Sequence, residues 1–294
     1  MARVTLDLDA LRSFVTGVDL DGYAKAADRL GRSTSAVSAH LKKLEEQAGA
    51  PLFRKAGRQL ALTDAGQMML NYARRMLDLN DEALIAVRAP QLEGRVRLGL
   101  QEDFGETLLP RVLGQFARVH RKVHIEVRIA RNSELLERVA SGRLDLALVW
   151  GDVEGADRVE RVASLQTCWI GNDDAREHLD RLPDEPLSLV LFDSPCLFQT
   201  MTVSALERAG IPWHVTYTSP SLAGLWAGAQ AGLGVTVRTR VGVPAGLHIL
   251  DPAECGLPSL PELSLSLHRA EHADEPVHAL ADAVLSTVHR AIAS

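Results

Sequence analysis

Apolar residues near the start of the chain recur at helical spacing. A short amphipathic run over residues 24–30 predicts a helix that ends at Gly31, because glycine adopts the left-handed conformation of a helix C-cap without strain. Ser33 or Thr34 can cap a second helix through a side-chain oxygen. The inward stripe of that second helix is formed by Val37, Leu41 and Leu44. Two short helices joined by so tight a turn predict a helix-turn-helix.

The opposite face of the second helix is small and polar. It carries Thr34, Ser35, Ser38, Ala39, Lys42 and Lys43. Small side chains allow a helix backbone to lie close to the base edges of DNA, and lysines can contact phosphates. After Pro51, two short alternating runs around Gly57 predict a β-hairpin, which would form the wing of a winged helix-turn-helix.

Residues 64–87 form a long apolar-periodic segment that contains no proline. One heptad seam consists of Met69, Tyr72, Met76, Leu79, Ala83 and Ala86. A second seam beside it consists of Leu70, Ala73, Leu77, Leu84 and Val87. Two adjacent seams predict a helix with two partners, which we expect to be the preceding domain and the same helix of a second subunit. Pro90 disfavours helix in the residue before it, so we place a hinge at residues 88–94.

From Arg95 onward the pattern changes to alternating strands and helices. The strands are expected at residues 96–100, 123–129 and 144–150, with helices between them at 106–120 and 132–142. Strands connected by helical crossovers predict a parallel sheet covered on both faces. In such folds a ligand binds beyond the carboxyl ends of the strands.

Charge divides the chain in the same way. Residues 25–58 hold eight Lys or Arg and three Asp or Glu, a net charge of +5. The whole chain of 294 residues carries −6, so the remainder carries −11. A basic island on an acidic protein is typical of a DNA-contacting module.

These features together resemble the LysR-type transcriptional regulators. The residues that carry the resemblance are Leu11, Phe14, Ala24, Ala26, Ala27, Leu30, Ser33, Ala36, Val37, Ser38, Leu41, Leu44, Glu45, Gly49, Pro51, Leu52, Phe53, Arg54, Leu62, Thr63, Ala65 and Gly66. The family's usual Gln-Pro pair at the start of the recognition helix is Thr34-Ser35 here, and its usual Arg or Gln after the second serine is Ala39. Residues 35–47 and 73–84 also resemble the branch related to the LrhA and HexA proteins.

The resemblance implies an α/β protein with an N-terminal all-α winged helix-turn-helix, a long linker helix and a periplasmic-binding-protein-like effector domain of two α/β subdomains. We expect the DNA-binding domain at residues 1–66, the dimerisation helix and hinge at 67–94, and the effector domain at 95–294. Subdomain I would comprise residues 95–166 and 264–294, and subdomain II residues 167–263.

The implied partners are double-stranded promoter DNA, a second copy of the chain, a small-molecule effector and RNA polymerase. Tetramers are usual in the family, so we expect a dimer of dimers. The DNA-contacting residues are expected to be Ser33, Thr34, Ser35, Ser38, Ala39, Lys42, Arg54, Lys55 and Arg58.

The effector cleft is expected where the strands end. The nominated residues are Gln101, Asp103, Phe104, Arg131, Asn132, Trp150, Phe198, Gln199, Ser219 and Arg238. Glu102 and Asp103 make the predicted mouth acidic, whereas Arg131 and Arg238 can take a carboxylate, and the sequence leaves both charges of ligand open.

Cys196 allows an alternative, a thiol-based redox sensor, because the peroxide-sensing branch of the family has its reactive cysteine near this position. No second cysteine follows within a short loop, and no Lys, Arg or His is adjacent to lower the thiol pKa. We therefore favour a buried structural thiol.

Other classes of protein fit less well. The sequence contains no GxSxG elbow, phosphate loop or dinucleotide fingerprint, so we expect no enzyme and no cofactor. The ten histidines and three cysteines show no metal-ligand spacing. A solute-binding protein would explain residues 95–294 but leave the winged helix unexplained. We find no membrane-spanning run or signal peptide and expect a cytoplasmic location.

Overall fold

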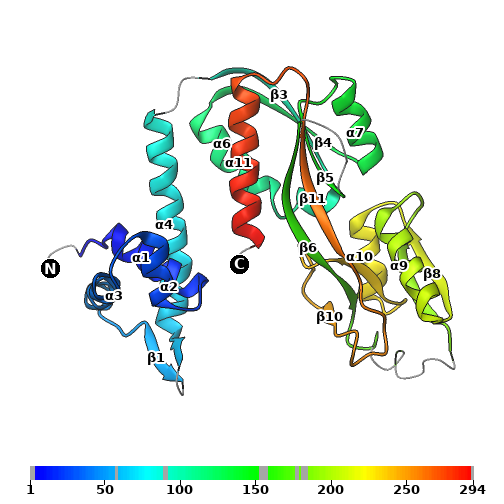
Figure 1. The fold of residues 1–294 in the computed structure, drawn as a ribbon, viewed down its shortest axis with the longest axis horizontal. Helices are drawn as coiled ribbons and strands as arrows, with labels where there is room; N and C mark the ends of the chain where they lie inside the picture. Colours follow the sequence, from blue (N-terminus) through cyan, green and yellow to red (C-terminus); the bar gives the residue numbers. More distant parts are fainter. Residues whose placement is uncertain are drawn as a thin grey trace. The chain divides into compact units, whose positions relative to one another are not determined.

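The chain folds as two compact units, residues 1–90 and residues 91–292 (Figure 1). The structure, a computed structural model, describes residues 4–56, 59–88, 92–151, 158–175, 179 and 185–292. Each unit is treated below by itself.

The first unit consists of helices and one small hairpin. Its elements are α1 (Leu8–Asp19), α2 (Tyr23–Leu30), α3 (Thr34–Ala48), β1 (Phe53–Ala56), β2 (Gln59–Leu62) and α4 (Asp64–Arg88). The helix ends follow the predicted signals. Gly31 closes α2 in the left-handed conformation at φ 63°, and the Ser33 side chain accepts a hydrogen bond from the Ala36 amide at the start of α3. Strands β1 and β2 pair antiparallel, which confirms the predicted hairpin.

The core of the first unit lies between α1, α3 and α4. Its buried members include Leu11 and Phe14 of α1 and Leu44 of α3. The Phe53 ring of β1 meets Phe14 and Tyr23 edge-on, each at 5.4 Å between ring centroids. Burial of the Tyr23 hydroxyl raises its pKa, so the phenol stays neutral.

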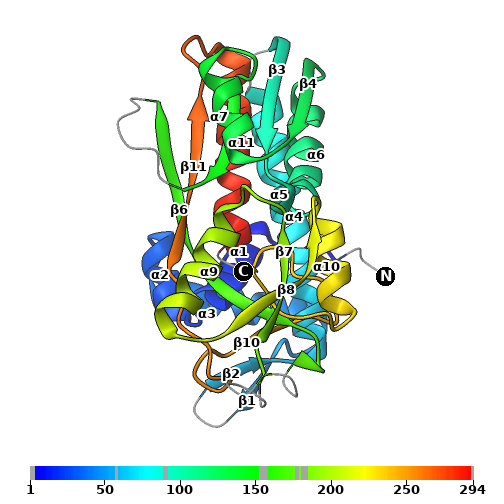
Figure 2. The same ribbon diagram turned by 90° about the vertical axis from the view of Figure 1, so that its right-hand side faces the viewer.

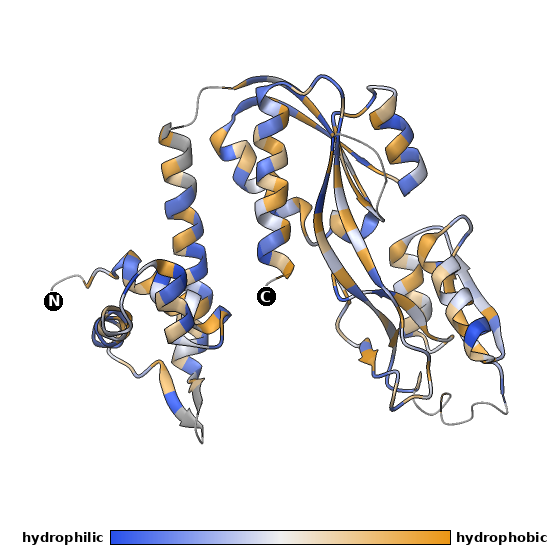
Figure 3. Cartoon of the chain, viewed as in Figure 1, coloured by the Kyte–Doolittle hydropathy of each residue, from blue (hydrophilic) through white to orange (hydrophobic). Residues whose placement is uncertain are grey.

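Helix α4 uses its two seams differently. In the second seam Leu70, Ala73 and Leu77 are buried against the core of the first unit, whereas Leu84 and Val87 are exposed. In the first seam, Met69 and Met76 also pack partly on that core. Tyr72 and Leu79 are 55% and 62% exposed. Each seam therefore contains both residues that pack on the core and residues that are exposed, whereas the prediction gave each seam a single partner. Figure 3 shows the apolar residues recurring along α4.

The second unit is built on a seven-stranded mixed sheet in the order β10-β6-β11-β5-β3-β4, with β9 also paired to β6. The strands are β3 (Glu93–Leu100), β4 (Lys122–Ile129), β5 (Leu146–Trp150), β6 (Val159–Gly171), β9 (Thr236–Thr239), β10 (His248–Leu250) and β11 (Glu262–Arg269). Strand β3 pairs parallel with β4 and β5, as the sequence pattern predicts. It begins at Glu93, inside the predicted hinge, and residues 89–91 of that hinge lie outside the described residues.

A second, two-stranded parallel sheet is formed by β7 (Leu187–Phe192) and β8 (Trp213–Ser219). Strands β6 and β11 lie side by side and connect the parts of the unit (Figure 2). The first half of β6 pairs with β11 as far as Gln166, and from Thr167 onward it pairs with β9 and then β10.

Helices cover these sheets. They are α5 (Glu102–Gly105), α6 (Leu109–Val119), α7 (Asn132–Ala140), α9 (Leu197–Ala209), α10 (Leu222–Gln230) and α11 (Glu275–Ile292). Helix α11 packs on α6, β3 and β6 through a buried stripe that includes Val277, Leu280 and Val284. The C-terminal helix thus returns to cover the first strand of this unit.

Candidate functional site

Helix α3 presents a small polar face to solvent. Thr34, Ser35, Ser38, Ala39 and Lys42 are all exposed, whereas Val37 and Leu44 on the opposite face are buried. The Lys42 side chain is 81% exposed and its ammonium lies 4.0 Å from the Glu46 carboxylate, one helical turn away. An exposed pair of this kind is weak, so Lys42 is available to another anion.

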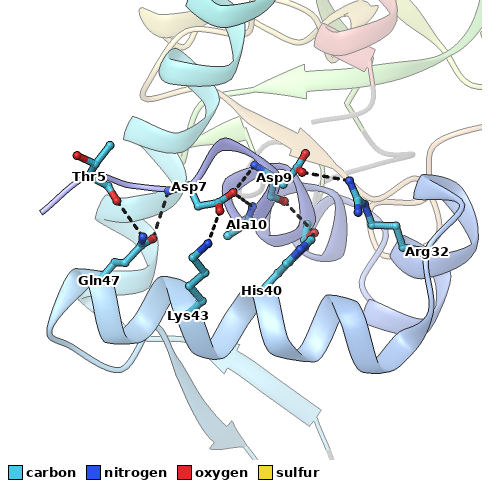
Figure 4. A network of polar contacts seen from close by, with 9 residues as sticks. Thr5, Asp7, Asp9, Ala10, Arg32, His40, Lys43 and Gln47 are labelled. Carbon is cyan, nitrogen blue, oxygen red and sulfur yellow. Dashed lines mark hydrogen bonds and ion pairs between the residues drawn. The ribbon is translucent and has the colours of Figure 1, made fainter.

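A polar network holds the other side of α3 against the N-terminal segment and α1 (Figure 4). Lys43 donates to the Asp7 carboxylate, and Gln47 donates to the Thr5 carbonyl at 2.8 Å. Asp7 also accepts from the Asp9 and Ala10 amides at 2.9 and 3.2 Å and so caps α1. The lysine, followed by these amides, lowers the Asp7 pKa. Lys43 is exposed, as the sequence pattern predicts, but unlike Lys42 it is bonded to a carboxylate of the N-terminal segment.

The turn before α3 is occupied by structural contacts. Ser33 Oγ accepts from the Ala36 amide at 3.2 Å and lies 2.9 Å from Ser35 Oγ. Arg32 donates to Asp9 at 3.1 Å. Part of the positive charge counted in the sequence is therefore neutralised within the first unit. Arg54 is exposed on β1, whereas the Lys55 side chain and Arg58 lie outside the described residues.

The second unit contains a cavity of about 580 Å³ where segments from both sheets meet. Its walls come from the ends of β5 and β7, from β9 and from the first turns of α5, α7 and α9. Seven of the ten nominated residues line it, namely Gln101, Asp103, Arg131, Asn132, Trp150, Phe198 and Arg238.

Two lining residues form polar bridges to neighbouring elements. Arg131 at the start of α7 donates to the Asp193 carboxylate, to the Asp193 carbonyl at 3.1 Å and to the Pro195 carbonyl at 3.3 Å. The carboxylate of Glu102, another lining residue, accepts from the Leu222 amide at the N-terminus of α10, where the helix dipole favours negative charge. Each bridge joins an element next to the large sheet to one next to β7 and β8.

Arg238 lies between two aromatic rings. Its guanidinium carbon is 4.3 Å from the Phe192 ring centroid and 4.4 Å from that of Phe198. Its Nη1 lies 3.7 Å from Asp103 Oδ2, and Trp150 Nε1 donates to the same oxygen at 3.4 Å. Within the described residues, no group of three or more His, Cys, Asp or Glu is placed to hold a metal ion.

Comparison with known proteins identifies both units. Residues 8–67 match the bacterial regulatory helix-turn-helix proteins of the lysR family, and residues 89–288 match the LysR substrate binding domain. The chain belongs to the LysR family. It is a LysR-type DNA-binding transcriptional regulator with an effector-binding domain.

Two LysR-type relatives match most of the chain. The HTH-type transcriptional regulator PecT of Dickeya dadantii is 34% identical over 284 residues, which cover 96% of this chain and 88% of PecT. The HTH-type transcriptional regulator DgdR of Burkholderia cepacia is 35% identical over 263 residues, which cover 90% of this chain and 87% of DgdR. The crystal structure of HinK, a LysR family transcriptional regulator from Pseudomonas aeruginosa, shares the fold. Its TM-score is 0.54 at 22% identity, with 97% of this chain and 99% of HinK covered.

Three residues nominated for the LysR-type effector cleft lie outside the cavity lining. Phe104 is buried in the core, with its ring 5.0 Å from that of Trp150, which itself lines the cavity. Ser219 Oγ accepts from the Ser221 amide at 3.2 Å and donates to the Ser221 carbonyl at 3.0 Å, so its hydroxyl shapes the turn before α10. Gln199 follows Phe198 on α9, where one step along a helix turns a side chain by about 100°.

The cavity lining includes further residues. Thr200 and Ser133 adjoin nominated residues in the strand-edge segments predicted from the sequence, Cys196 is the predicted alternative redox site, and Phe192 and Glu134 were not predicted. Phe192 ends β7, so the strand-end rule that selected Trp150 selects this residue too. Glu134 accepts from Arg128 and Arg138, which together lower its pKa.

The three cysteines of this LysR-type chain are free. Cys196 is half-buried at the N-terminus of α9, which differs from the fully buried thiol favoured from the sequence. Cys168 and Cys255 are buried, and burial raises the pKa of the Cys168 thiol. No helix in the described part of the chain has both the length and the apolar character needed to cross a membrane.

Proposed function

We propose that this LysR-type regulator binds an interrupted palindrome in promoter DNA as a dimer, and that a small molecule in the cavity of the second unit sets its activity. The observation that carries the proposal is the division of α3 into two faces. Thr34, Ser35, Ser38 and Ala39 leave its outer surface small and exposed. Such a surface allows the helix to enter the major groove, where side chains reach base edges.

Phosphate contacts come from the basic residues that the first unit leaves exposed. We assign this role to Lys42 next to the reading face and to Arg54 on the hairpin, with Lys55 and Arg58 as sequence-based candidates. Ser33 keeps a supporting role, because its hydroxyl caps α3. Backbone contacts of this kind give sequence-independent affinity and fix the register of the protein on DNA.

A second copy of the chain is the proposed partner of α4. Tyr72 and Leu79 are large apolar side chains exposed on α4, seven residues apart and therefore on one face of the helix. An exposed apolar stripe is costly in water, and the same stripe on a twofold-related helix covers it. Two copies held in this way present two α3 helices to successive turns of the major groove. From the family we propose a dimer of dimers as the complete assembly.

The cavity is the proposed effector site. It draws walls from both sheets, its volume suits a small molecule, and the bridges made by its residues Arg131 and Glu102 link elements next to the two sheets. A ligand that contacts both walls stabilises one arrangement over another and shifts the population. We propose residues 95–166 with 264–294 and residues 167–263 as the two parts that respond.

The test is retardation of the chain's own upstream DNA in a mobility-shift assay. We expect a specific complex that survives an excess of random DNA. A solute-binding protein or an enzyme would leave the fragment unretarded, and that result would refute the proposal.

A further inference from the structure

One ion pair in the cavity wall is incompletely satisfied. Asp103 of α5 and Arg238 of β9 line the cavity, and their side chains are only 3% and 4% exposed. Their nearest charged atoms are 3.7 Å apart, which is longer than a good hydrogen bond. The two charges therefore attract each other, but both side chains keep hydrogen-bonding capacity that the pair does not use.

Each partner has a buried atom without a hydrogen bond. Asp103 Oδ1 and Arg238 Nε have no partner among the described residues. A buried charged group that lacks hydrogen bonds destabilises the structure, and an unexplained case points to a missing ligand or water. Rotation about the broad terminal torsion of Asp103 can turn Oδ1 toward the cavity. A ligand that donates to Asp103 and accepts from Arg238 would satisfy both.

The other charged side chains of the lining already have partners. Arg131 is bonded to Asp193, Glu102 to the α10 amide and Glu134 to two arginines. Among the charged side chains of the described lining, Asp103 and Arg238 thus have hydrogen-bond donors or acceptors left for a ligand. The charges of Asp103 and Arg238 cancel. A ligand that is only an anion would therefore be buried against Asp103, and one that is only a cation would be buried against Arg238.

Aromatic side chains define the rest of the site. Phe192 and Phe198 hold the Arg238 guanidinium between them, which fixes the plane of its donors. The ring of Trp150 meets Phe198 edge-on at 5.9 Å. The charged pair is therefore bordered by apolar surface that suits a hydrocarbon group.

We propose that the effector is a small zwitterion with an apolar side chain, of the kind represented by a free apolar amino acid. Its carboxylate accepts from Arg238, its ammonium donates to Asp103, and its side chain contacts Trp150 and Phe198. A guanidinium fixed in plane is suited to bidentate binding of a carboxylate. This inference rests on the proposed function, because it takes the cavity as the effector site.

The experiment is isothermal titration of the full chain with three matched probes, L-leucine, 4-methylpentanoate and 3-methylbutylamine. The two analogues each lack one charged group of the amino acid. We expect L-leucine to bind about tenfold or more tightly than either analogue, since each analogue leaves a buried charge unpaired. L-phenylalanine and L-valine are titrated alongside to cover different side-chain sizes.

A charge change should reverse the preference. In Asp103→Asn the like-charge contact with a lone carboxylate is gone, so 4-methylpentanoate should bind as well as L-leucine or better. Thr200→Ala, a neutral change in the same lining, should leave the preference unchanged. Thermal unfolding of each unliganded variant checks that the second unit is folded.

Equal binding of amino acid and analogues, no binding of any of the three amino acids, or an unchanged preference in Asp103→Asn would each overturn the inference. Retardation of upstream DNA is measured on the same samples. If the DNA is retarded while no amino acid binds, the zwitterion is refuted and the DNA-binding function stands. If the DNA is not retarded, the proposed function fails whatever the probes do.

Discussion

The outer face of α3 and the cavity of the second unit both carry charge and polar atoms, yet they are built in opposite ways. On α3 the small side chains and Lys42 are exposed and come from one short stretch of sequence. In the cavity Asp103 and Arg238 are buried and come from segments more than 130 residues apart in the sequence. The first surface is suited to a large, highly charged partner, and the second to a small one that replaces water completely.

The physical consequence is a difference in sensitivity. Exposed charges act through a screened field, so each contributes modestly and its effect depends on salt. Buried charges act at short range and are costly when unpaired. Lys42 and Lys43 are both exposed and differ in their partners, since Lys42 has only a weak pair with Glu46 and Lys43 is bonded to the cap of α1.

The largest expected effect comes from destabilising one unit while the other stays folded. A Cβ on Gly66 would lie 2.1 Å from the Leu52 carbonyl oxygen, and one on Gly234 would lie 2.3 Å from the Ser188 carbonyl oxygen. Because backbone must move in both cases, we expect each alanine variant to lose about 3 kcal/mol of stability in its own unit. Calorimetry should show the Gly66→Ala loss in the first unit and the Gly234→Ala loss in the second.

If either glycine variant lowers the stability of both units equally, the units are coupled and the comparison between them fails. DNA retardation gives an independent readout. It should be lost in Gly66→Ala at temperatures where Gly234→Ala still retards random DNA through its intact first unit.

The next effect concerns assembly. Leu79→Glu places like charges across the proposed α4 contact, and Leu79 is exposed enough that the unit itself should still fold. We expect sedimentation to show loss of the dimer, and operator affinity to fall by roughly 10²-fold, since two linked half-site contacts become one.

Gln67→Glu is the matched control, because it adds the same charge at an exposed α4 position about 120° around the helix. An intact Leu79→Glu dimer would place the subunit contact elsewhere, and a monomeric Gln67→Glu would show that any added charge suffices.

A smaller effect separates the two adjacent lysines of α3. Lys42→Ala should weaken specific and random DNA alike and reduce the slope of log affinity against log salt by about one unit. Lys43→Ala should leave that slope nearly unchanged and instead lower the stability of the first unit, because Asp7 loses its strongest partner. Salt titrations of DNA binding, paired with thermal unfolding, measure both. Equal slopes for wild type and Lys42→Ala would mean that Lys42 does not contact the backbone.

The smallest expected effect is a difference in acid sensitivity. Burial lowers the pKa of His268 and His120 in the second unit below the ordinary 6.5. As the pH falls, these histidines bind protons in the unfolded chain before they do so in the folded one. Their contribution to stability is therefore complete above about pH 6.5 and decreases as the pH falls below it. Asp7 in the first unit has its pKa lowered below 3.8, so its contribution persists until the pH falls through that range.

The stability of the second unit, measured by unfolding, should therefore fall between pH 7.5 and pH 5.5. His268→Gln should make that stability depend less on pH. The Asp7 contribution should stay constant over the same interval. A His268→Gln variant with the wild-type pH profile would show that this histidine is not responsible.

The first unit could be predicted closely because its signals are local. The cap at Ser33, the end at Gly31 and the inward stripe of α3 each depend on residues a few positions apart. The ion pair of Lys43 could not be predicted in the same way, because its partner Asp7 lies 36 residues away in the sequence.

The cavity could be predicted only in part. The strand-end rule selected Asn132 and Trp150, which are bonded to each other through the Trp150 amide at 3.1 Å. It also selected Ser219, whose hydroxyl bonds within its own turn, and it passed over Phe192. Strand ends can be read from a sequence, but which side chains converge depends on how β6 and β11 connect the sheets.

The most direct test of the contrast between the two sites is hydrogen exchange on the full chain, with and without a double-stranded fragment of its own upstream region. We expect DNA to slow exchange across residues 34–42 and in β1, where the exposed face and Arg54 lie, since bound segments open less often. Unchanged exchange across residues 34–42, with protection confined to residues 92–292, would contradict the assignment of α3 as the DNA-reading surface.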